Sequence, residues 1–325
     1  MDPIQNLYAP GAGTRPPELA GRDELRETVR VVLARVQHGH SAKSVLMVGL
    51  RGVGKTVLLD RMREEAEEAG LQTLFVEASE ERSLPATLAP QLRQALLKLS
   101  GNAMAQDMAQ RGLRAIAGFV QTLKVKFQDI EVALDFDPEP GLADNGNLEQ
   151  DLTEMLLAAG AAAKKAETVL SLFVDELQYI NEDELAALIT ALHRAAQRQA
   201  PVVLVGAGLP QLRARMGNAR SYAERMFDVH EVGPLAPEAA RRAIEKPARD
   251  EGVAIDDNAL QRIFEMTHGY PYFLQEWDKY AWDIADTSPI SLGDVERAWA
   301  TAYDAQFTKR KQPYQTQMSL ATLSW

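Results

Sequence analysis

The sequence predicts an α/β protein in which a parallel sheet is flanked by helices and followed by a small all-helical domain. Two observations carry this prediction. Short apolar runs that suit buried parallel strands alternate with helical periodicity up to residue 205, and beyond Pro234 only helical patterns occur. With 325 residues, of which 46% are hydrophobic and 25% charged, the chain can bury a substantial core.

The strand candidates are short apolar runs that end in, or lie close to, glycine or acidic residues. They are 44–48, 72–76, 169–174 and 202–205. The helix candidates carry apolar residues at steps of three and four. They are 21–36, 61–70, 85–99, 102–122, 147–166 and 182–199 in the first part of the chain, then 236–250, 256–268, 270–286 and 292–304.

These patterns divide the chain into four parts. Residues 1–20 contain four Pro and two Gly, so we expect a flexible N-terminal segment. Residues 21–233 form the α/β core, 234–304 a helical lid domain and 305–325 a C-terminal tail. Within the core, apolar and charged residues alternate over 123–137, which predicts an inserted hairpin.

Composition excludes several classes of protein. The chain has no Cys, which excludes disulfides, thiolate metal sites and Cys nucleophiles. Its longest uncharged stretch has 14 residues, whereas a membrane-spanning helix needs about 20 apolar ones, and its N-terminus has no secretory signal. We therefore expect a cytoplasmic protein with no membrane partner. The net charge of −11 argues against nucleic-acid binding by the chain as a whole.

The main chemical signal is a phosphate-binding loop. Residues 49–56 read Gly-Leu-Arg-Gly-Val-Gly-Lys-Thr, which fits GxxxxGK[ST] between a strand candidate and a helix. The glycines let backbone N–H groups turn toward a β-phosphate, Lys55 reaches the β- and γ-phosphates, and the Thr56 hydroxyl ligates Mg²⁺. The motif thus predicts ATP and Mg²⁺ as ligands. The predicted nucleotide-binding residues of the motif are Gly49, Arg51, Gly52, Val53, Gly54, Lys55, Thr56 and Val57.

A second signal is the acidic pair Asp175-Glu176, which follows the apolar run 169–174. Ligands of parallel sheets bind at the carboxyl ends of the strands. There Asp175 would hold Mg²⁺, directly or through water, and Glu176 would orient and deprotonate the attacking water. An acidic pair after a strand is also common at helix starts. The phosphate loop earlier in the chain favours the catalytic interpretation, with Glu176 and Lys55 as catalytic residues.

Taken together, these features resemble the AAA+ and STAND-type ATPases, particularly the archaeal ATPase and origin-recognition-like initiator branch. The resemblance covers about residues 21–290. It rests on residues 19–25 (Leu-Ala-Gly-Arg-Asp-Glu-Leu), the phosphate loop, residues 173–178 (Phe-Val-Asp-Glu-Leu-Gln) and the helical region after Pro234. It implies a P-loop NTPase core with a helical lid.

The resemblance also implies further nucleotide contacts. In such families the Gly-Arg-x-x-x-Leu turn packs near the adenine, which would place Gly21 and Arg22 in the nucleotide site. The alternative is a plain helix N-terminus. Gly269-x-Pro271 looks like the Gly-x-Pro turn that brings the backbone against the nucleotide in STAND and archaeal ATPases, and a helix start with Pro in its first turn is the alternative.

Arg225 lies where the family often carries an arginine finger, which reaches the γ-phosphate of a neighbouring subunit in an oligomer. Arg220 and plain surface salt bridging are the alternatives. Two positions depart from the family pattern. No polar sensor side chain follows the strand candidate 202–205, where residues 206–208 read Gly-Ala-Gly, and Tyr272 stands where initiator-type relatives have a lid arginine.

We therefore expect an ATPase that switches conformation or assembly through ATP·Mg²⁺ binding and hydrolysis, with a protein client of unknown identity and a homo-oligomer if Arg225 is a finger. A low-turnover nucleotide-binding regulator is one alternative, and a DNA-associated initiator or transposition-type helper is another. Initiator-like relatives continue into a DNA-contacting winged-helix domain. Here only about 20 residues follow the last helix candidate, which together with the charge disfavours DNA.

Overall fold

The computed structural model describes residues 1–8, 10–11, 13–123 and 136–299. By its internal contacts the chain divides into two compact units. The α/β unit is Arg22–Gly233, and the helical unit combines Met1–Gly21 with the residues from Pro234 onward. No helix within the described part of the chain is long and apolar enough to cross a membrane.

A parallel sheet forms the centre of the α/β unit. Among the described residues it has five strands in the order β2-β3-β4-β1-β5, and each neighbouring pair is parallel. The carboxyl ends of all the strands therefore lie at the same end of the sheet, where ligands of such sheets bind. The strands are β1 (Ser44–Val48), β2 (Gln72–Glu77), β3 (Leu170–Asp175), β4 (Val202–Gly208) and β5 (Phe227–Glu231).

Four of these strands were predicted from their apolar runs, and the predicted α/β class is confirmed. Strands β1, β3 and β4 are buried almost throughout, as expected of central parallel strands covered on both faces. Strand β5 was not predicted. It lies at the edge of the sheet, and its exposed Asp228 and Glu231 interrupt the apolar pattern.

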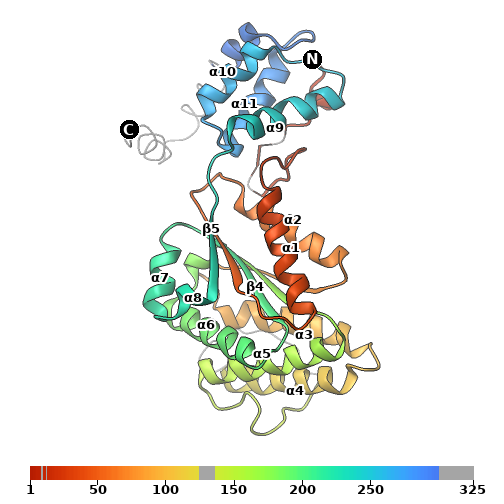
Figure 1. The fold of residues 1–325 in the computed structure, drawn as a ribbon, viewed down its shortest axis with the longest axis vertical. Helices are drawn as coiled ribbons and strands as arrows, with labels where there is room; N and C mark the ends of the chain where they lie inside the picture. Colours follow the sequence, from red (N-terminus) through yellow and green to blue (C-terminus); the bar gives the residue numbers. More distant parts are fainter. Residues whose placement is uncertain (9, 12, 124–135, 300–325) are drawn as a thin grey trace. The chain divides into compact units, whose positions relative to one another are not determined.

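Helices cover both faces of the sheet (Figure 1). On β1, Leu46 and Val48 belong to the main core cluster with the α3–α6 layer, whereas the alternate residues Val45 and Met47 are buried on the other face, where α1 and α2 pack. The helices of this unit are α1 (Asp23–Gln37), α2 (Lys55–Glu68), α3 (Leu84–Ser100), α4 (Gln106–Leu123), α5 (Leu148–Lys165), η2 (Leu177–Tyr179), α6 (Glu182–Gln197), α7 (Leu212–Ala219) and α8 (Ala223–Met226).

Local capping explains where several of these helices begin. Ser83, Asn147 and Asn181 precede α3, α5 and α6, and each side-chain oxygen accepts a hydrogen bond from a backbone N–H of the first turn. The α4 region packs on α3 and α5. Most of the hairpin predicted over 123–137 lies outside the described residues, since 124–135 are not described.

The helical unit contains η1 (Pro3–Gln5), α9 (Pro237–Asp250), α10 (Asp257–Thr267) and α11 (Pro271–Ile284), and residues 292–299 are also helical. The remainder of the predicted helix 292–304 and the tail 305–325 lie outside the described residues. The core of this unit combines side chains from all three long helices, including Ile244, Ile263, Leu274 and Trp282.

The N-terminal segment differs from the flexible one expected from its Pro and Gly content. Tyr8 is only 2% exposed, and its ring meets that of Trp282 edge to face, with centroids 6.3 Å apart. Its hydroxyl donates a hydrogen bond to the Ile244 carbonyl at 2.5 Å. Composition describes the local backbone preference of this segment, whereas burial of one aromatic side chain in the helical unit fixes its position.

The core of the helical unit also contains an unusual acid. Asp278 on α11 is 2% exposed, and neither carboxyl oxygen has a hydrogen-bond partner among the described residues. Burial raises the pKa of Asp278 well above its ordinary value. The folded chain therefore holds a proton that the unfolded chain releases at lower pH. Stability should fall as the pH rises from the ordinary aspartate pKa of about 3.9 through the higher folded value.

Asp278→Asn should accordingly raise the melting temperature of the full chain at pH 7 to 8, by about 4 °C or more, because asparagine cannot ionise. The gain should shrink as the pH falls toward about 3, below the ordinary aspartate pKa, where Asp278 is neutral in both states. Thermal unfolding across this pH range measures it, with the exposed Asp286→Asn as control. A gain that is independent of pH would contradict the burial of an ionisable carboxyl as its cause.

Candidate nucleotide-binding site

The predicted phosphate loop connects the carboxyl end of β1 to the start of α2. Gly49 has to be glycine, because a Cβ there would lie 2.1 Å from the Val232 carbonyl oxygen. Gly52 and Gly54 have φ of 80° and 87°, in the left-handed region that favours glycine. Gly54 is the N-cap of α2, which begins at Lys55. The loop thus ends at a helix N-terminus, where backbone N–H groups and the helix dipole favour an anion.

Lys55 points back into this loop. Its Nζ donates hydrogen bonds to the carbonyl oxygens of Gly49 at 3.0 Å and Leu50 at 2.9 Å, and the residue is 6% exposed. Burial lowers the pKa of Lys55, while the negative charges of Glu176 and Asp175 oppose that shift. The ammonium therefore lies in the same small region as both predicted acids.

Asp175 is the last residue of β3 and is 1% exposed. Burial raises the pKa of Asp175, and a hydrogen bond with the Thr56 side chain is the largest opposing contribution. The structure thus brings together the two predicted Mg²⁺ ligands. Magnesium is commonly held by one or two protein oxygens, together with water and substrate phosphates. A buried carboxylate paired with a hydroxyl beside a phosphate loop fits that ion.

Glu176 follows directly, in a left-handed conformation with φ 53° and ψ 37°. Such a conformation is unusual outside glycine and is often found at functional sites. It turns the chain sharply from β3 into η2, and the Glu176 backbone N–H donates to Oδ1 of Asp175 at 2.8 Å. The Glu176 carboxylate accepts a hydrogen bond from Nε2 of Gln178. Gln178 was not predicted, although it stands two residues after the acidic pair.

Other predicted residues join the loop to its surroundings. Arg51 is exposed and donates to the Tyr179 hydroxyl at 2.8 Å, which links the loop to η2. The Arg22 guanidinium donates to the carbonyl oxygens of Val53, at 3.4 Å, and Gly233. Arg22 therefore reaches the phosphate loop directly, and its predicted contact with the nucleotide stays a prediction. Val53 itself is buried, and Val57 is half-buried in the first turn of α2.

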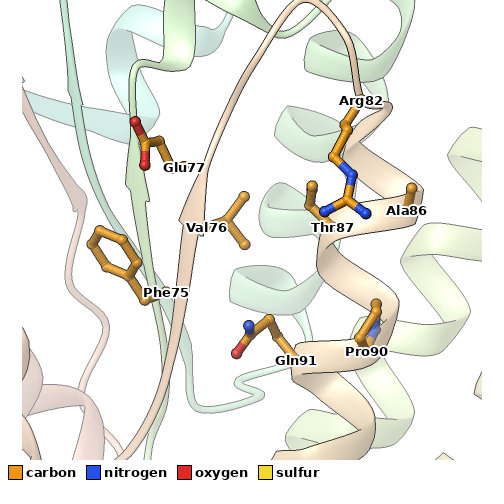
Figure 2. Close-up of a pocket in the computed structure, with 8 residues that line it drawn as sticks. All are labelled: Phe75, Val76, Glu77, Arg82, Ala86, Thr87, Pro90 and Gln91. Atoms are coloured by element: carbon orange, nitrogen blue, oxygen red, sulfur yellow. The ribbon is translucent and has the colours of Figure 1, made fainter. Parts of the chain in front are cut away.

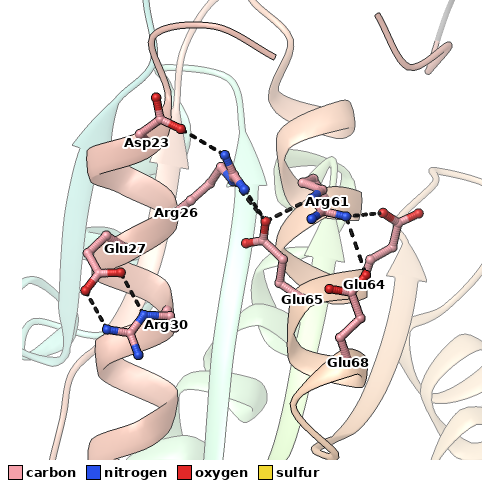
Figure 3. A network of polar contacts seen from close by, with 8 residues as sticks. All are labelled: Asp23, Arg26, Glu27, Arg30, Arg61, Glu64, Glu65 and Glu68. Carbon is pink, nitrogen blue, oxygen red and sulfur yellow. Dashed lines mark hydrogen bonds and ion pairs between the residues drawn. The ribbon is translucent and has the colours of Figure 1, made fainter. Parts of the chain in front are cut away.

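A polar network also ties α1 to α2 (Figure 3). One oxygen of Glu65 on α2 accepts from the Arg26 guanidinium on α1, at 3.0 Å from Nε, and from Nε of Arg61 at 2.8 Å. All three side chains are about one-quarter exposed. Because such a shared ion pair is partly shielded from water, it is stronger than an isolated surface pair. It holds the start of α1, next to Arg22, beside the helix that follows the phosphate loop.

Gly21 and Pro271 belong to the helical unit. Gly21 has φ of 68°, and a Cβ there would lie 2.7 Å from that of Ala239. Pro271 is the first residue of α11, as in the alternative interpretation of a helix start. Gly269 has φ of 73° and packs against the Leu235 carbonyl. These glycines are thus required by packing within the helical unit, and the predicted nucleotide contacts of Gly21 and Pro271 stay predictions.

The two finger candidates lie in different environments. The Arg220 guanidinium contacts Glu149 on α5 and donates from Nε to the Thr190 hydroxyl on α6 at 3.1 Å, so it links two helices of its own chain. Arg225 on α8 is exposed, and its guanidinium has no hydrogen bond or ion pair among the described residues. Of the two, Arg225 is the one available to a partner.

A cavity of about 310 Å³ lies between the edge strand β2 and α3 (Figure 2). Its lining includes Phe75, Arg82, Thr87 and Gln91 and none of the predicted nucleotide-binding residues. The sheet order places β3 and β4 between it and the strand that leads into the phosphate loop.

Three comparisons place this arrangement among known proteins. Residues 18–205 match the AAA ATPase domain family. No curated protein sequence matches the chain significantly. Many solved structures share the fold, among them the ORC1 protein of Aeropyrum pernix in complex with DNA, with a TM-score of 0.52 and 16% identity over 91% of this chain and 69% of that one.

Two further structures are similar over most of the chain. A Walker-type ATPase of Pyrococcus abyssi gives a TM-score of 0.55 and 15% identity, covering 92% of this chain and 75% of that one. The ORC2 protein of Aeropyrum pernix, in ADPNP and ADP complexes, gives 0.51 and 14%, covering 93% and 74%. At these identities the likeness concerns the fold. The family match spans more than half of the sequence and includes the phosphate loop and the acidic pair, so the chain belongs to the AAA ATPase family.

Proposed function

We propose that this chain binds ATP with Mg²⁺ and hydrolyses it, and that the cycle switches its conformation or assembly. The observation that carries this proposal is the meeting of Lys55, Thr56, Asp175 and Glu176 at one edge of the sheet. Lys55 and Thr56 come from the start of α2, and the two acids come from the end of β3. Family membership supports the same activity.

Each of these side chains has a task in phosphoanhydride hydrolysis. Lys55 would contact the β- and γ-phosphates and stabilise the charge that develops on them. Thr56 and Asp175 would hold Mg²⁺, which would supply positive charge to offset that of the phosphates. Glu176 would orient a water molecule toward the γ-phosphorus and accept its proton as the oxygen–phosphorus bond forms and the bond to the β-phosphate oxygen breaks.

Glu176→Gln tests this assignment. The amide keeps the size of the carboxylate but cannot accept the proton, so turnover should fall about 100-fold or more while ATP affinity changes little. Steady-state hydrolysis and equilibrium ATP binding measure the two effects, with Glu182→Gln, an exposed glutamate on α6, as control. Turnover equal to that of the unmodified chain would rule out Glu176 as the base.

A low-turnover nucleotide-binding regulator is the second candidate function, favoured by Gly206 and Gly208 at the end of β4, a strand that carries no polar side chain. A chain that binds ATP tightly yet shows no measurable hydrolysis would be such a regulator. A DNA-associated helper is supported by the fold shared with ORC1 and opposed by the net charge of −11. DNA binding that weakens steeply with salt would favour that third class.

A further inference from the structure

Gln178 connects the predicted base to the end of a different strand. The residue lies in η2, two positions after Glu176, and is 5% exposed. Its Nε2 donates to Oε2 of Glu176, while its Oε1 accepts a hydrogen bond from the Leu209 backbone N–H at 3.0 Å. Leu209 is the first residue after β4. The buried amide of Gln178 thus links the segment after β3 to the segment after β4, at the carboxyl ends of these two strands.

The glycines of β4 make room for this arrangement. A Cβ at Gly208 would lie 2.9 Å from Oε1 of Gln178, and a Cβ at Gly206 would lie 2.3 Å from Cδ1 of Leu177. Both distances are too short for an ordinary carbon contact. The strand therefore lacks side chains at the two positions where η2 packs against it.

The backbone of Gln178 is held as well. The guanidinium of Arg215, on α7, donates to the carbonyl oxygens of Gln178 and, at 2.6 Å, of Ile180. Because α7 follows β4 after a short turn, the segment beyond β4 contacts both the side chain and the main chain of Gln178. Gln178 is consequently held at three points, two on its side-chain amide and one on its backbone carbonyl.

We propose that Gln178 is a positioning residue for Glu176. From η2, Gln178 supplies a polar link to the end of β4, a strand that has no polar side chain of its own. The inference rests on the proposed function. The Glu176 carboxylate lies close enough to Lys55 for its charge to act on the ammonium. The carboxylate is therefore near the lysine that is expected to contact the phosphates. A hydrogen bond to one carboxylate oxygen fixes the rotamer and leaves the other oxygen for a water molecule.

Gln178→Met is the first test, because methionine has a similar length and volume but makes no comparable hydrogen bonds. The turnover number should fall about 10- to 100-fold, the scale of a misplaced catalytic group, while ATP affinity stays within about twofold. Gln150→Met is the matched control, since it removes an exposed glutamine–glutamate hydrogen bond on α5. An unchanged turnover number in a folded Gln178→Met chain would overturn the inference.

A double-variant cycle separates positioning from a general structural effect. If Gln178 acts through Glu176, the Gln178→Met change should cause no further loss of turnover in the Glu176→Gln background. A loss of the same factor in both backgrounds would overturn the inference, because it would show that Gln178 acts on something other than Glu176.

Gln178→Glu tests the two hydrogen bonds of the Gln178 amide separately. It keeps an acceptor for the Leu209 N–H but replaces the donor to Glu176 with an oxygen. Turnover should therefore fall as in Gln178→Met, while hydrogen exchange at the Leu209 amide stays slow. In Gln178→Met that exchange should become about tenfold faster, without any nucleotide present. Turnover retained in Gln178→Glu would overturn the inference.

The failure of the inference and that of the proposed function are distinguishable. If the unmodified chain hydrolyses ATP and Glu176→Gln does not, yet Gln178→Met hydrolyses ATP normally, the ATPase assignment stands and the role of Gln178 falls. If the unmodified chain does not hydrolyse ATP, the proposed turnover falls and the inference falls with it, whatever the exchange rate at Leu209.

Discussion

Lys55→Ala is expected to weaken ATP binding by about 10³-fold while leaving the fold intact. The Lys55 ammonium lies inside the phosphate loop, hydrogen-bonded to the carbonyl oxygens of Gly49 and Leu50, and the residue is 6% exposed. Removing one partner of a buried, hydrogen-bonded charge pair costs several kcal/mol, on the order of 2–5, which corresponds to this loss. The rest of the fold should be retained, because these hydrogen bonds of Lys55 go to carbonyl oxygens of the loop itself.

Equilibrium binding of ATP to the full chain measures the effect, and thermal unfolding checks the fold. The control is Lys43→Ala, since Lys43 is exposed and lies just before β1. Affinity for ATP equal to that of the unmodified chain would refute the assignment of residues 49–56 as the phosphate loop.

The pH dependence has a defined sign. Burial lowers the pKa of Lys55 in the chain without nucleotide, so the side chain loses its proton at a lower pH than an ordinary lysine. The charged form is the one that attracts phosphate. ATP affinity should thus be highest below this pKa and fall as the pH rises through it, and the Lys55→Ala chain should lack this alkaline loss.

Much of the fold could be predicted because its signals are local. Strands β1, β3 and β4 are buried on both faces, which produces continuous apolar runs. The edge strand β5 has no such run, since Asp228 and Glu231 are exposed and only Phe227 is fully buried. The burial of Tyr8 could not be predicted either, because it depends on Ile244 and Trp282, more than 200 residues away in the sequence.

The candidate site likewise has parts that local sequence predicts and parts that depend on residues far apart in the sequence. The phosphate loop and the acidic pair are contiguous motifs, whose chemistry can be inferred from their spacing. The role inferred for Gln178 depends on the neighbouring positions of β3 and β4 in the sheet, which bring Leu209 to its side chain. In the sequence, Gly206 and Gly208 indicated a missing sensor. In the structure, they are the two positions against which η2 packs.

Arg225→Ala is expected to lower ATP hydrolysis by about 10³-fold if Arg225 is an arginine finger, while ATP affinity changes far less. The register of the sheet restricts how such a finger could act. Phe227, two residues after Arg225, pairs with Ser44 at the amino end of β1, whereas the phosphate loop follows Val48 at the carboxyl end. The two ends are roughly 13 Å apart along the strand, so a finger at Arg225 would serve the site of a second copy.

Mixing two inactive variants tests this directly. Lys55→Ala subunits lack a nucleotide site and Arg225→Ala subunits lack the finger, but a mixed oligomer would pair an intact site on one subunit with an intact finger on its neighbour. Hydrolysis should then return on mixing and depend on protein concentration. Arg213→Ala is the control, because Arg213 is an exposed arginine on α7. If the chain stays monomeric with ATP, or if mixing restores no hydrolysis, Arg225 is a surface residue and the low-turnover regulator becomes the better description.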